Sequence, residues 1–434
     1  MRFVVATLHF GGLGFALRLQ DEGHEVLLAT AGIADRRLED RYRLVGEGLV
    51  PRMPLAAAMA QRSGWRDAIW IWDENHSVAE NELLRAEGFL VFGGGSYPDR
   101  MEHDREACLL LMGEHGLKPP PSFAFESSAE ALTFLDEHRD TAFVYKPDKG
   151  EPHDTWLPQS ADSAQANQEL RQHLRTLGRA GAFVLQERKD GVETNVEVWF
   201  VRGEPVFAFM TLESKHKLTG DLGDLVGCGF DFTFVVPVDC RAVRETVGRL
   251  FDVYREMQYT GFGDANFIVA KDGLWFFEKC ERFGYNAHPN LFWNLNRAPL
   301  GETFASLVDG TFRPDFAPGF GASVTMYMDH PSPGKAIHFP DTVASHLYFL
   351  DVYREEGQFL TAGYYGEAVL LACGFGYTLP TAWEAALDVA ATVHFPGRSY
   401  RLDGAGTDYP SSPVRRYEAL TAMGYLQGST PAPL

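Results

Sequence analysis

The first hundred residues of the chain alternate short apolar runs with polar stretches, and the first such stretch has a helical pattern. The apolar runs are 2–8 (RFVVATL), 24–30 (HEVLLAT), 65–73 (WRDAIWIWD) and 89–94 (FLVFGG). Each is short enough to be a buried strand. Alternation of strands with helices favours a parallel sheet, because parallel strands need a crossover connection. We therefore expect an α/β domain with a doubly wound parallel sheet over residues 1–103.

A glycine turn follows the first predicted strand. Gly11, Gly12 and Gly14 stand directly before a helical stretch. In a doubly wound sheet this turn is where anionic ligands meet the N-terminus of a helix. The sequence is GGLG and not GxGxxG, so a tight turn without a ligand is an equally good interpretation. Gly12 and Gly14 are candidate substrate contacts.

Composition excludes several classes of protein. The 434 residues carry a formal net charge of −20, without a basic run that would offset the repulsion of nucleic acid. No apolar stretch approaches the ~20 residues that span a bilayer. Five cysteines without a CxxC pair argue against a disulfide framework or a structural zinc site. We expect a cytoplasmic protein whose partners are small molecules, with the oligomeric state left open.

The remainder of the chain has a mixed pattern. We expect one helix over 101–116 and another that begins at the serines 127–128. Antiparallel hairpins are expected around the turns at 202–205 and 271–273. A Pro/Gly-rich stretch at 315–321 marks a boundary, and a small α/β domain is expected after it.

Three side chains near residue 280 suggest a metal and phosphate site. Glu278, Cys280 and Arg282 alternate by two, so we expect them on one face of a strand, with Asn266 on the preceding strand. Carboxylate and amide oxygens are ligands that Mg²⁺ prefers, and an arginine can hold a phosphate through two hydrogen bonds. Taken alone, an exposed acidic strand face is the commoner explanation.

Further strand ends carry charged or polar groups in a recognisable order. Lys146 ends one apolar strand, Gln186 and Glu187 end another, and Glu193 and Lys217 follow. A single lysine at a strand end is usually a solvated residue. Taken in order, these motifs resemble the ATP-grasp fold, and within it the glycinamide ribonucleotide synthetase (phosphoribosylamine–glycine ligase) family. The resemblance spans nearly the whole chain.

The resemblance implies an ATP site with Mg²⁺ or Mn²⁺. Lys146 matches the family's phosphate-binding lysine. The segment 184–195 (VLQERKDGVETN) matches the family's hinge, which implies that Gln186, Glu187 and Arg188 contact adenine and that Glu193 contacts the ribose.

The resemblance also implies the catalytic and metal-binding residues. Lys217 is a second phosphate contact, Arg105 stands where a lysine usually approaches ATP, and Arg282 and Lys217 stabilise the transferring phosphoryl group. The implied metal ligands are Asn266, Glu278 and Cys280.

The implied architecture is α/β and α+β multidomain. It comprises an N-terminal domain (1–103), a lid subdomain (104–183), a central ATP-grasp subdomain (184–318) and a small C-terminal α/β domain (319–434). The implied reaction joins a carboxylate to an amine through an acyl phosphate.

The sequence departs from the family in three places. Cys280 replaces an asparagine, and a thiol is a poor ligand for Mg²⁺. Water or Glu281 would complete the site, although alternation along the strand directs Glu281 to the opposite face. The glycine-rich loop after Lys146 is replaced by DKGEPHDTW, in which Lys149 or His153 would contact phosphate. The family's GPNTGGMG segment is absent.

The third departure, besides the absent GPNTGGMG segment, is that RFGYNAHPN replaces RFGDPE. This replacement makes Tyr285, Asn286 and His288 candidate substrate contacts. Loss of the acidic-proline turn removes a counter-charge for an ammonium group, so we expect an acceptor amine that is less cationic or held by other groups.

Three functions follow from these motifs and departures. The first is a ligase of this family with altered substrates. The second is the phosphoribosylamine–glycine ligase of purine synthesis itself. The third is a catalytically silent ATP-grasp module that binds nucleotide.

Overall fold

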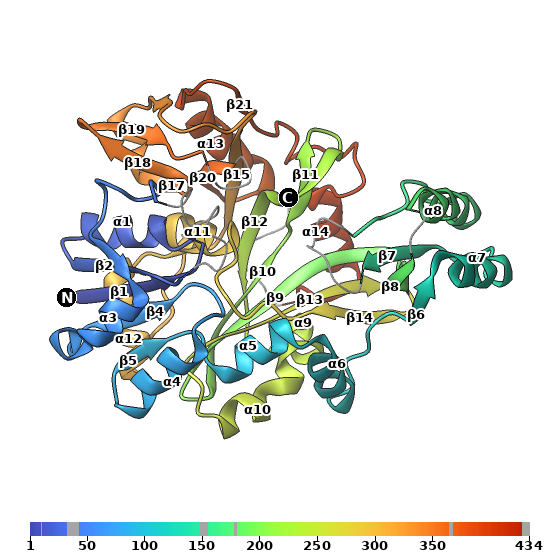
Figure 1. Cartoon of the computed structure of the whole chain (residues 1–434), viewed down its shortest axis with the longest axis horizontal. Coiled ribbons are helices and arrows are strands. Elements are labelled where there is room, and N and C mark those ends of the chain that lie inside the picture. The colour runs from blue at the N-terminus through green and yellow to red at the C-terminus, as the bar shows by residue number, and fades with distance from the viewer. Residues whose placement is uncertain (10, 33–42, 148–154, 178–179, 364–367, 428–434) are drawn as a thin grey trace. The chain divides into compact units, whose positions relative to one another are not determined.

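The computed structural model describes residues 1–9, 11–32, 43–147, 155–177, 180–363 and 368–427 (Figure 1). The chain forms two compact units. Unit 1 contains Met1–Cys108, Thr194–Asn266 and Glu278–Leu434, and unit 2 contains Leu109–Glu193 and Phe267–Phe277. The division into four domains and subdomains expected from the sequence stays a prediction. None of the described helices is long and apolar enough to cross a membrane.

The first sheet of unit 1 is parallel throughout. Its strands are β1 (Arg2–Thr7), β2 (Glu25–Thr30), β3 (Arg52–Pro54), β4 (Ile69–Trp72) and β5 (Leu90–Phe92), in the order β3-β2-β1-β4-β5. The predicted doubly wound sheet is therefore confirmed. The strand order reverses between β1 and β4, and sheets of this kind bind ligands at the carboxyl ends of the strands beside such a reversal.

Both faces of this sheet are covered, as strands with continuous apolar runs require. Its helices are α1 (Leu13–Asp21), α3 (Leu55–Ala60), α4 (Val78–Ala86) and α12 (Leu300–Asp309). Val4 and Ala6 of β1 pack in one cluster with residues of α3 and α4. Phe3 and Val5 point the other way and are also fully buried. Helices α1 and α12 contact the sheet as well.

The helix expected over 101–116 is instead two helices, α5 (Ser96–His103) and α6 (Arg105–Glu114). The break falls at Asp104, which has an extended ψ of 85°. Its carboxylate accepts a hydrogen bond from the backbone N–H of Ala107 at 3.0 Å. An aspartate that caps a new helix competes with continuation of the previous one.

A second, larger sheet of unit 1 contains strands from the central and C-terminal regions of the chain. Its order is β13 (Gly261–Ala270), β9 (Gly191–Val201), β10 (Glu204–Thr211), β12 (Leu222–Val236), β15 (Phe320–Met328), β20 (Ala368–Gly376) and β17 (Leu347–Phe349). Strand β11 (Ser214–Leu218) pairs with β12, and β21 (Arg398–Ser399) pairs with β15. The C-terminal region thus extends the sheet of the central region.

The C-terminal region also has a three-stranded sheet of its own. It contains β16 (Ala336–Ile337), β19 (Gln358–Thr361) and β18 (Val352–Glu355). The other helices of unit 1 are α9 (Arg241–Glu245), α10 (Phe251–Glu256), α11 (Ala287–Asn290), α13 (Leu379–Thr392) and α14 (Pro413–Ala422). Short 3₁₀ turns lie at Arg62–Trp65, Val247–Leu250 and Asp341–His346, and a π turn lies at Leu291–Leu295.

Unit 2 packs two helices against an antiparallel sheet. The sheet has the order β6 (Ser122–Ser127), β8 (Ala180–Glu187) and β7 (Phe143–Pro147), and the helices are α7 (Ser128–Glu137) and α8 (Ser163–Leu177). The side chain of Ser127 accepts from the N–H of Glu130, so the predicted capped helix is confirmed. The unit also contains the ends of β9 and β13 and most of β14 (Gly273–Glu278).

We predict that the core of unit 2 depends on Leu170. This residue of α8 is fully buried with Phe143, Phe183 and Leu185. Leu170→Ala should lower the free energy of unfolding by about 2–5 kcal/mol, because it opens a cavity. Leu110→Ala is the matched control, since Leu110 of the same unit is 65% exposed. Equal urea midpoints for both variants would contradict the packing described.

Candidate functional site

The candidate site lies where β1 and β4 end. Gly11 and Gly12 follow β1, and Asp73 and Glu74 follow β4 directly. The backbone N–H of Gly12 donates to Oδ2 of Asp73 at 2.6 Å. A Cβ on Gly12 would lie 2.8 Å from the same oxygen, so glycine permits this close approach. Asp73 is buried, and desolvation together with neighbouring Glu74 raises its pKa well above the usual value.

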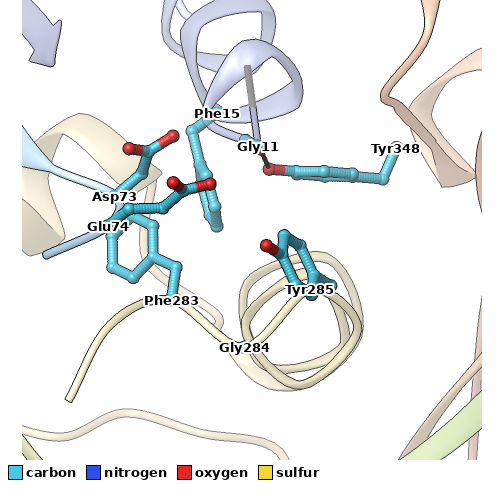
Figure 2. A pocket seen from close by; sticks show the side chains of 8 residues that line it. All are labelled: Gly11, Phe15, Asp73, Glu74, Phe283, Gly284, Tyr285 and Tyr348. Carbon is cyan, nitrogen blue, oxygen red and sulfur yellow. Dashed lines mark hydrogen bonds between the residues drawn. The ribbon is translucent and has the colours of Figure 1, made fainter. Parts of the chain in front are cut away.

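A small pocket opens at this point of unit 1 (Figure 2). It is lined by two glycines, two carboxylates and four aromatic rings: Gly11, Gly284, Asp73, Glu74, Phe15, Phe283, Tyr285 and Tyr348. The residues come from α1, from the ends of β1 and β4, from β17 and from the loop before α11. Segments far apart in the sequence therefore meet at the crevice that the strand order creates.

Tyr348 explains one of the predicted glycines. Its hydroxyl donates to the backbone oxygen of Gly11. A Cβ on Gly14 would lie 2.5 Å from the Tyr348 ring. Gly14 is thus needed for this ring to pack on the first turn of α1.

The loop that follows Arg282 carries one predicted substrate residue into the pocket. The N–H of Phe283 donates to the backbone oxygen of Asp73 at 2.9 Å. Tyr285 then lines the pocket beside two carboxylates. The loop itself carries no carboxylate, and Asp73 and Glu74 reach the pocket from the end of β4. The expectation of an acceptor amine that is less cationic or held by other groups stays a prediction.

Asn286 and His288 do not line this pocket. Asn286 is buried and donates to the hydroxyls of Ser323 and Thr325 at 2.9 and 3.1 Å. His288 is fully buried, and its Nδ1 accepts from the N–H of Gly284 at 2.9 Å. The Asn286 bonds hold the loop against β15, and the His288 bond closes the loop on itself. Substrate contact by either residue stays a prediction.

Arg282 lies beside the pocket. Its Nε donates to Oε1 of Glu102 at 3.2 Å, and its guanidinium lies 4.8 Å from the centre of the Tyr285 ring. Asn75 donates to the other oxygen of Glu102 at 2.8 Å. Arg282 is thus oriented by a carboxylate that the sequence did not single out.

Strand β14 ends at Glu278. The predicted placement of residues 278, 280 and 282 on one strand required it to continue to residue 282. Burial nevertheless continues to alternate, since Glu278 is exposed, Cys280 and Arg282 are half-buried, and Lys279 and Glu281 are buried. Lys279 and Glu281 form an ion pair with fully buried side chains. Glu281 is therefore engaged in the core and does not complete a metal site.

The proposed metal ligands differ in chemistry. The half-buried Asn266 lies near Asn195, whose Nδ2 is 3.5 Å from Oδ1 of Asn266. The side chain of Glu278 forms no hydrogen bond or ion pair within the described regions of the chain. These two oxygen donors fit Mg²⁺, which takes few protein ligands and keeps several waters. Desolvation and Glu278 raise the pKa of the Cys280 thiol well above its usual value. A protonated thiol is a poor ligand for Mg²⁺.

Other groups of potential metal ligands in the described residues do not offer a better metal site. Among the residues that the structure describes, no group of three or more His, Cys, Asp or Glu side chains could hold a metal ion. The buried Asp264 is already bound, since its Oδ1 accepts from the N–H of Cys280 at 3.0 Å and its Oδ2 accepts from Asn195.

Comparison with known proteins supports a single fold. No family model matches the chain. A phosphoribosylamine–glycine ligase of Leifsonia xyli subsp. xyli is 25% identical over 416 residues, 91% of each protein. The crystal structure of the Thermotoga maritima phosphoribosylamine–glycine ligase matches with a TM-score of 0.65 at 19% identity, over 92% of this chain and 99% of that one.

A third protein is the biotin carboxylase domain of the Hydrogenobacter thermophilus 2-oxoglutarate carboxylase, solved with MgADP, ADP and bicarbonate. It matches with a TM-score of 0.57 at 12% identity, over 92% of this chain and 91% of that one. The protein has the ATP-grasp fold. The fold class and the resemblance to phosphoribosylamine–glycine ligases predicted from the sequence are confirmed, and the similarity supports the predicted class of enzyme, a C–N ligase.

Several ATP-grasp positions predicted to contact ATP lie in unit 2. Lys146 on β7 has its Nζ 5.5 Å from the centre of the Phe277 ring. Gln186 is buried and donates to Ser122 at 3.0 Å. Glu187 ends β8, and its carboxylate lies 2.7 Å from Nζ of Lys189. The chain between 186 and 188 is thus held in place, and its contact with adenine stays a prediction.

The remaining residues that were predicted to contact ATP are divided between the two units. Arg188 donates to the backbone oxygens of Ser160 and Ala161 at 2.6 and 3.0 Å. Glu193 is half-buried at the start of β9 in unit 2. In unit 1, Arg105 is exposed at the start of α6, and Lys217 donates to Asp329 at 3.2 Å. Lys149 and His153 lie outside the described residues.

Sequence reasoning missed several polar and aromatic residues of the site. Asp73 and Glu74 close a buried strand at the edge that also carries the glycine turn, and this signal could have identified them. Glu102 gave no such signal, because its role depends on the position of Arg282. Tyr348 lies 334 residues beyond Gly14 in the chain, and nothing local predicts their contact.

We predict that the buried Lys279–Glu281 pair stabilises the strand end. Lys279→Ala leaves a buried carboxylate without its cation and should lower the free energy of unfolding by about 3–5 kcal/mol. The double variant Lys279→Met with Glu281→Leu removes both charges at similar volume and should lose clearly less. Urea titration measures both. A double variant that is less stable than Lys279→Ala would contradict this account.

Proposed function

We propose that the protein is an ATP-dependent carboxylate–amine ligase with substrates that differ from those of phosphoribosylamine–glycine ligase. The main support is similarity to that ligase over 91% of both chains, combined with Asn266 within β13 and Glu278 at the end of β14. The altered substrates are supported by the crevice, where Asp73 already occupies the N–H of Gly12. A ligand phosphate would lose this donor and meet a carboxylate.

The proposed reaction has two steps. The carboxylate substrate attacks the γ-phosphate of ATP, which gives an acyl phosphate and ADP. The amine then attacks the acyl carbon, phosphate leaves, and an amide forms after loss of a proton. Phosphoryl transfer depends mainly on positioning and on stabilisation of charge. The protein therefore has to supply fixed cations and exclude water.

We assign the cations to Lys146, Lys217 and Arg282. Lys217 and Arg282 are paired with Asp329 and Glu102, at 3.2 Å in each case. A phosphate group would compete with these carboxylates for the same donors. In the proposed complex, Arg105 approaches the phosphates as well.

We assign nucleotide recognition to the hinge of unit 2. Gln186, Glu187 and Arg188 would contact adenine, and Glu193 would accept hydrogen bonds from the ribose hydroxyls. A metal ion would neutralise phosphate charge when bound, and Asn266 and Glu278 are the residues that would hold it. Cys280 is at most a marginal ligand.

We assign the remaining positions and the domain roles in the same way. Gly12, Gly14 and Tyr285 would shape the substrate crevice, with Asn286 and His288 holding its loop. Residues 104–183 would act as a lid that excludes water, over the central subdomain 184–318. The N-terminal domain, residues 1–103, would bind the acceptor, and 319–434 would form the C-terminal domain.

Two other functions compete with this proposal. The 25% identity to a phosphoribosylamine–glycine ligase favours that activity itself. Cys280, which stands where the family has a metal-binding asparagine, favours a silent module that binds ATP without turnover. Each of the three functions predicts a different dependence of ADP release on added substrates.

ADP release by the purified chain tests the proposal. With Mg·ATP and mixtures of amino acids and amines, we expect ADP only when a carboxylate and an amine are both present. Glycine with phosphoribosylamine should not be the best pair. Glu278→Gln should lower turnover by more than about tenfold, whereas Glu384→Gln, an exposed control, should not. Cys280→Asn should leave activity equal or higher.

Two results would overturn the proposal in different ways. Formation of glycinamide ribonucleotide with a kcat/KM near ~10⁴ M⁻¹s⁻¹ would establish the authentic ligase. ATP binding without ADP release in any mixture would instead favour the silent module.

Nucleotide binding by unit 2 gives a further prediction. Lys146→Ala and Glu187→Ala should each weaken Mg·ATP binding by about tenfold or more, because each removes a charge-assisted hydrogen bond. Lys118→Ala is the control, since Lys118 is an exposed lysine of the same unit. Thermal shifts measured over a range of Mg·ATP concentrations give the affinities. Unchanged shifts in both variants would refute the hinge assignment.

A further inference from the structure

The pocket at the ends of β1 and β4 combines buried carboxylates with aromatic rings. Asp73 and Glu74 are 1% and 8% exposed. Four rings close the other sides, those of Phe15, Phe283, Tyr285 and Tyr348. Figure 2 shows the Glu74 carboxylate directed toward the space between the two tyrosines. A cation is the class of ligand that both a carboxylate and the face of an aromatic ring attract.

One oxygen of Glu74 has no partner among the described residues. Its Oε2 lies 2.7 Å from Nδ1 of His9, whereas the buried Oε1 forms no hydrogen bond there. A buried carboxylate oxygen without a donor is unfavourable, and native proteins rarely retain one. This free oxygen therefore marks the point where a donor from a ligand would be stabilised.

The same pocket is unsuited to a phosphate. In the glycine turn, the backbone N–H of Gly12 is bound by Asp73 at 2.6 Å. A phosphate at this turn would have to displace that carboxylate and then lie beside Glu74. The start of α1 thus offers negative charge where the N-terminus of a helix otherwise attracts anions.

The free space also limits the size of the group. It measures about 10 Å³, which is roughly the room that one water molecule needs. An ammonium group is of this size and carries several N–H donors. Mg²⁺ dehydrates reluctantly and keeps several waters, so it is too large in its hydrated form and meets apolar rings here.

We propose that this pocket binds the ammonium group of a primary-amine substrate that carries no phosphate. The inference rests on the proposed ligase function and names the class of its acceptor. Glu74 Oε1 accepts a hydrogen bond from the ammonium, and Tyr285 and Tyr348 line the space around it. The Tyr285 ring also lies 4.8 Å from the guanidinium of Arg282, whose charge is balanced by Glu102 at 3.2 Å. Asp73 holds the glycine turn through the N–H of Gly12.

The matched probes are ethanolamine and phosphoethanolamine, which differ only in a phosphate. Their binding to the full chain is measured by calorimetry and by competition with 1,4-diaminobutane, in the absence of ATP. We expect ethanolamine to bind with a Kd of about 1 mM or below and phosphoethanolamine at least about tenfold more weakly. Because no ATP is present, ethanolamine can bind even if the chain releases no ADP from ATP. The amine pocket and the ligase function are therefore tested separately.

Glu74→Gln keeps the shape of the side chain and removes its charge. We expect it to weaken ethanolamine binding by about tenfold or more, whereas the exposed control Glu256→Gln should leave it unchanged. Tyr285→Leu is a second variant that removes a ring and should weaken binding several-fold. Circular dichroism verifies that each variant folds.

Four outcomes would contradict the inference. The first is no binding of ethanolamine or 1,4-diaminobutane at about 10 mM, well above the expected Kd. The second is tighter binding of phosphoethanolamine than of ethanolamine. The third is unchanged affinity in both folded variants, Glu74→Gln and Tyr285→Leu. Displacement of ethanolamine by Mg²⁺ at equal concentration would instead assign the pocket to a metal ion and count against it.

Discussion

The hydrogen bond from the N–H of Gly12 to Asp73 joins the two strand ends on which the crevice is built. It links the turn after β1 to the residue after β4 at 2.6 Å, at the point where the strand order reverses. Because Asp73 also accepts through its backbone oxygen from Phe283, the loop that carries Tyr285 is fixed to the same place. The identity of the groups around this bond decides which ligands unit 1 can hold.

The bond also changes the electrostatic character of the turn. In many α/β sheets the N-terminus of the first helix is free to receive phosphate. In this protein a carboxylate of the chain itself takes that place, and Glu74 adds a second negative charge nearby. The fold is shared with a phosphoribosylamine–glycine ligase of known structure, and the chemistry at this turn of the present chain is that of two carboxylates. A fold establishes where a ligand can bind, and the side chains at that point determine its class.

Within residues 278–288, burial distinguishes the side chains that hold the structure from those that a ligand can reach. Around residue 280, Lys279 and Glu281 pair inside the core, and Glu278 remains exposed on the same strand end. In the following loop, His288 and Asn286 fix the backbone, and Tyr285 reaches the pocket. Neighbouring residues of similar polarity thus have opposite roles, because alternate side chains leave a strand or loop in opposite directions.

The sequence by itself determined the parallel sheet, through its alternation of apolar runs and helices, and the ATP-grasp resemblance, through the order of Lys146, Glu187, Lys217 and Glu278. Local patterns sufficed there because strand burial and strand-end charges depend on near neighbours. Only the tertiary structure decided that Tyr348 packs on Gly14, that Asp73 and Glu74 face Tyr285, and that β15 joins β12. These contacts join residues that lie far apart in the chain, and their formation depends on packing across the whole unit rather than on any local periodicity.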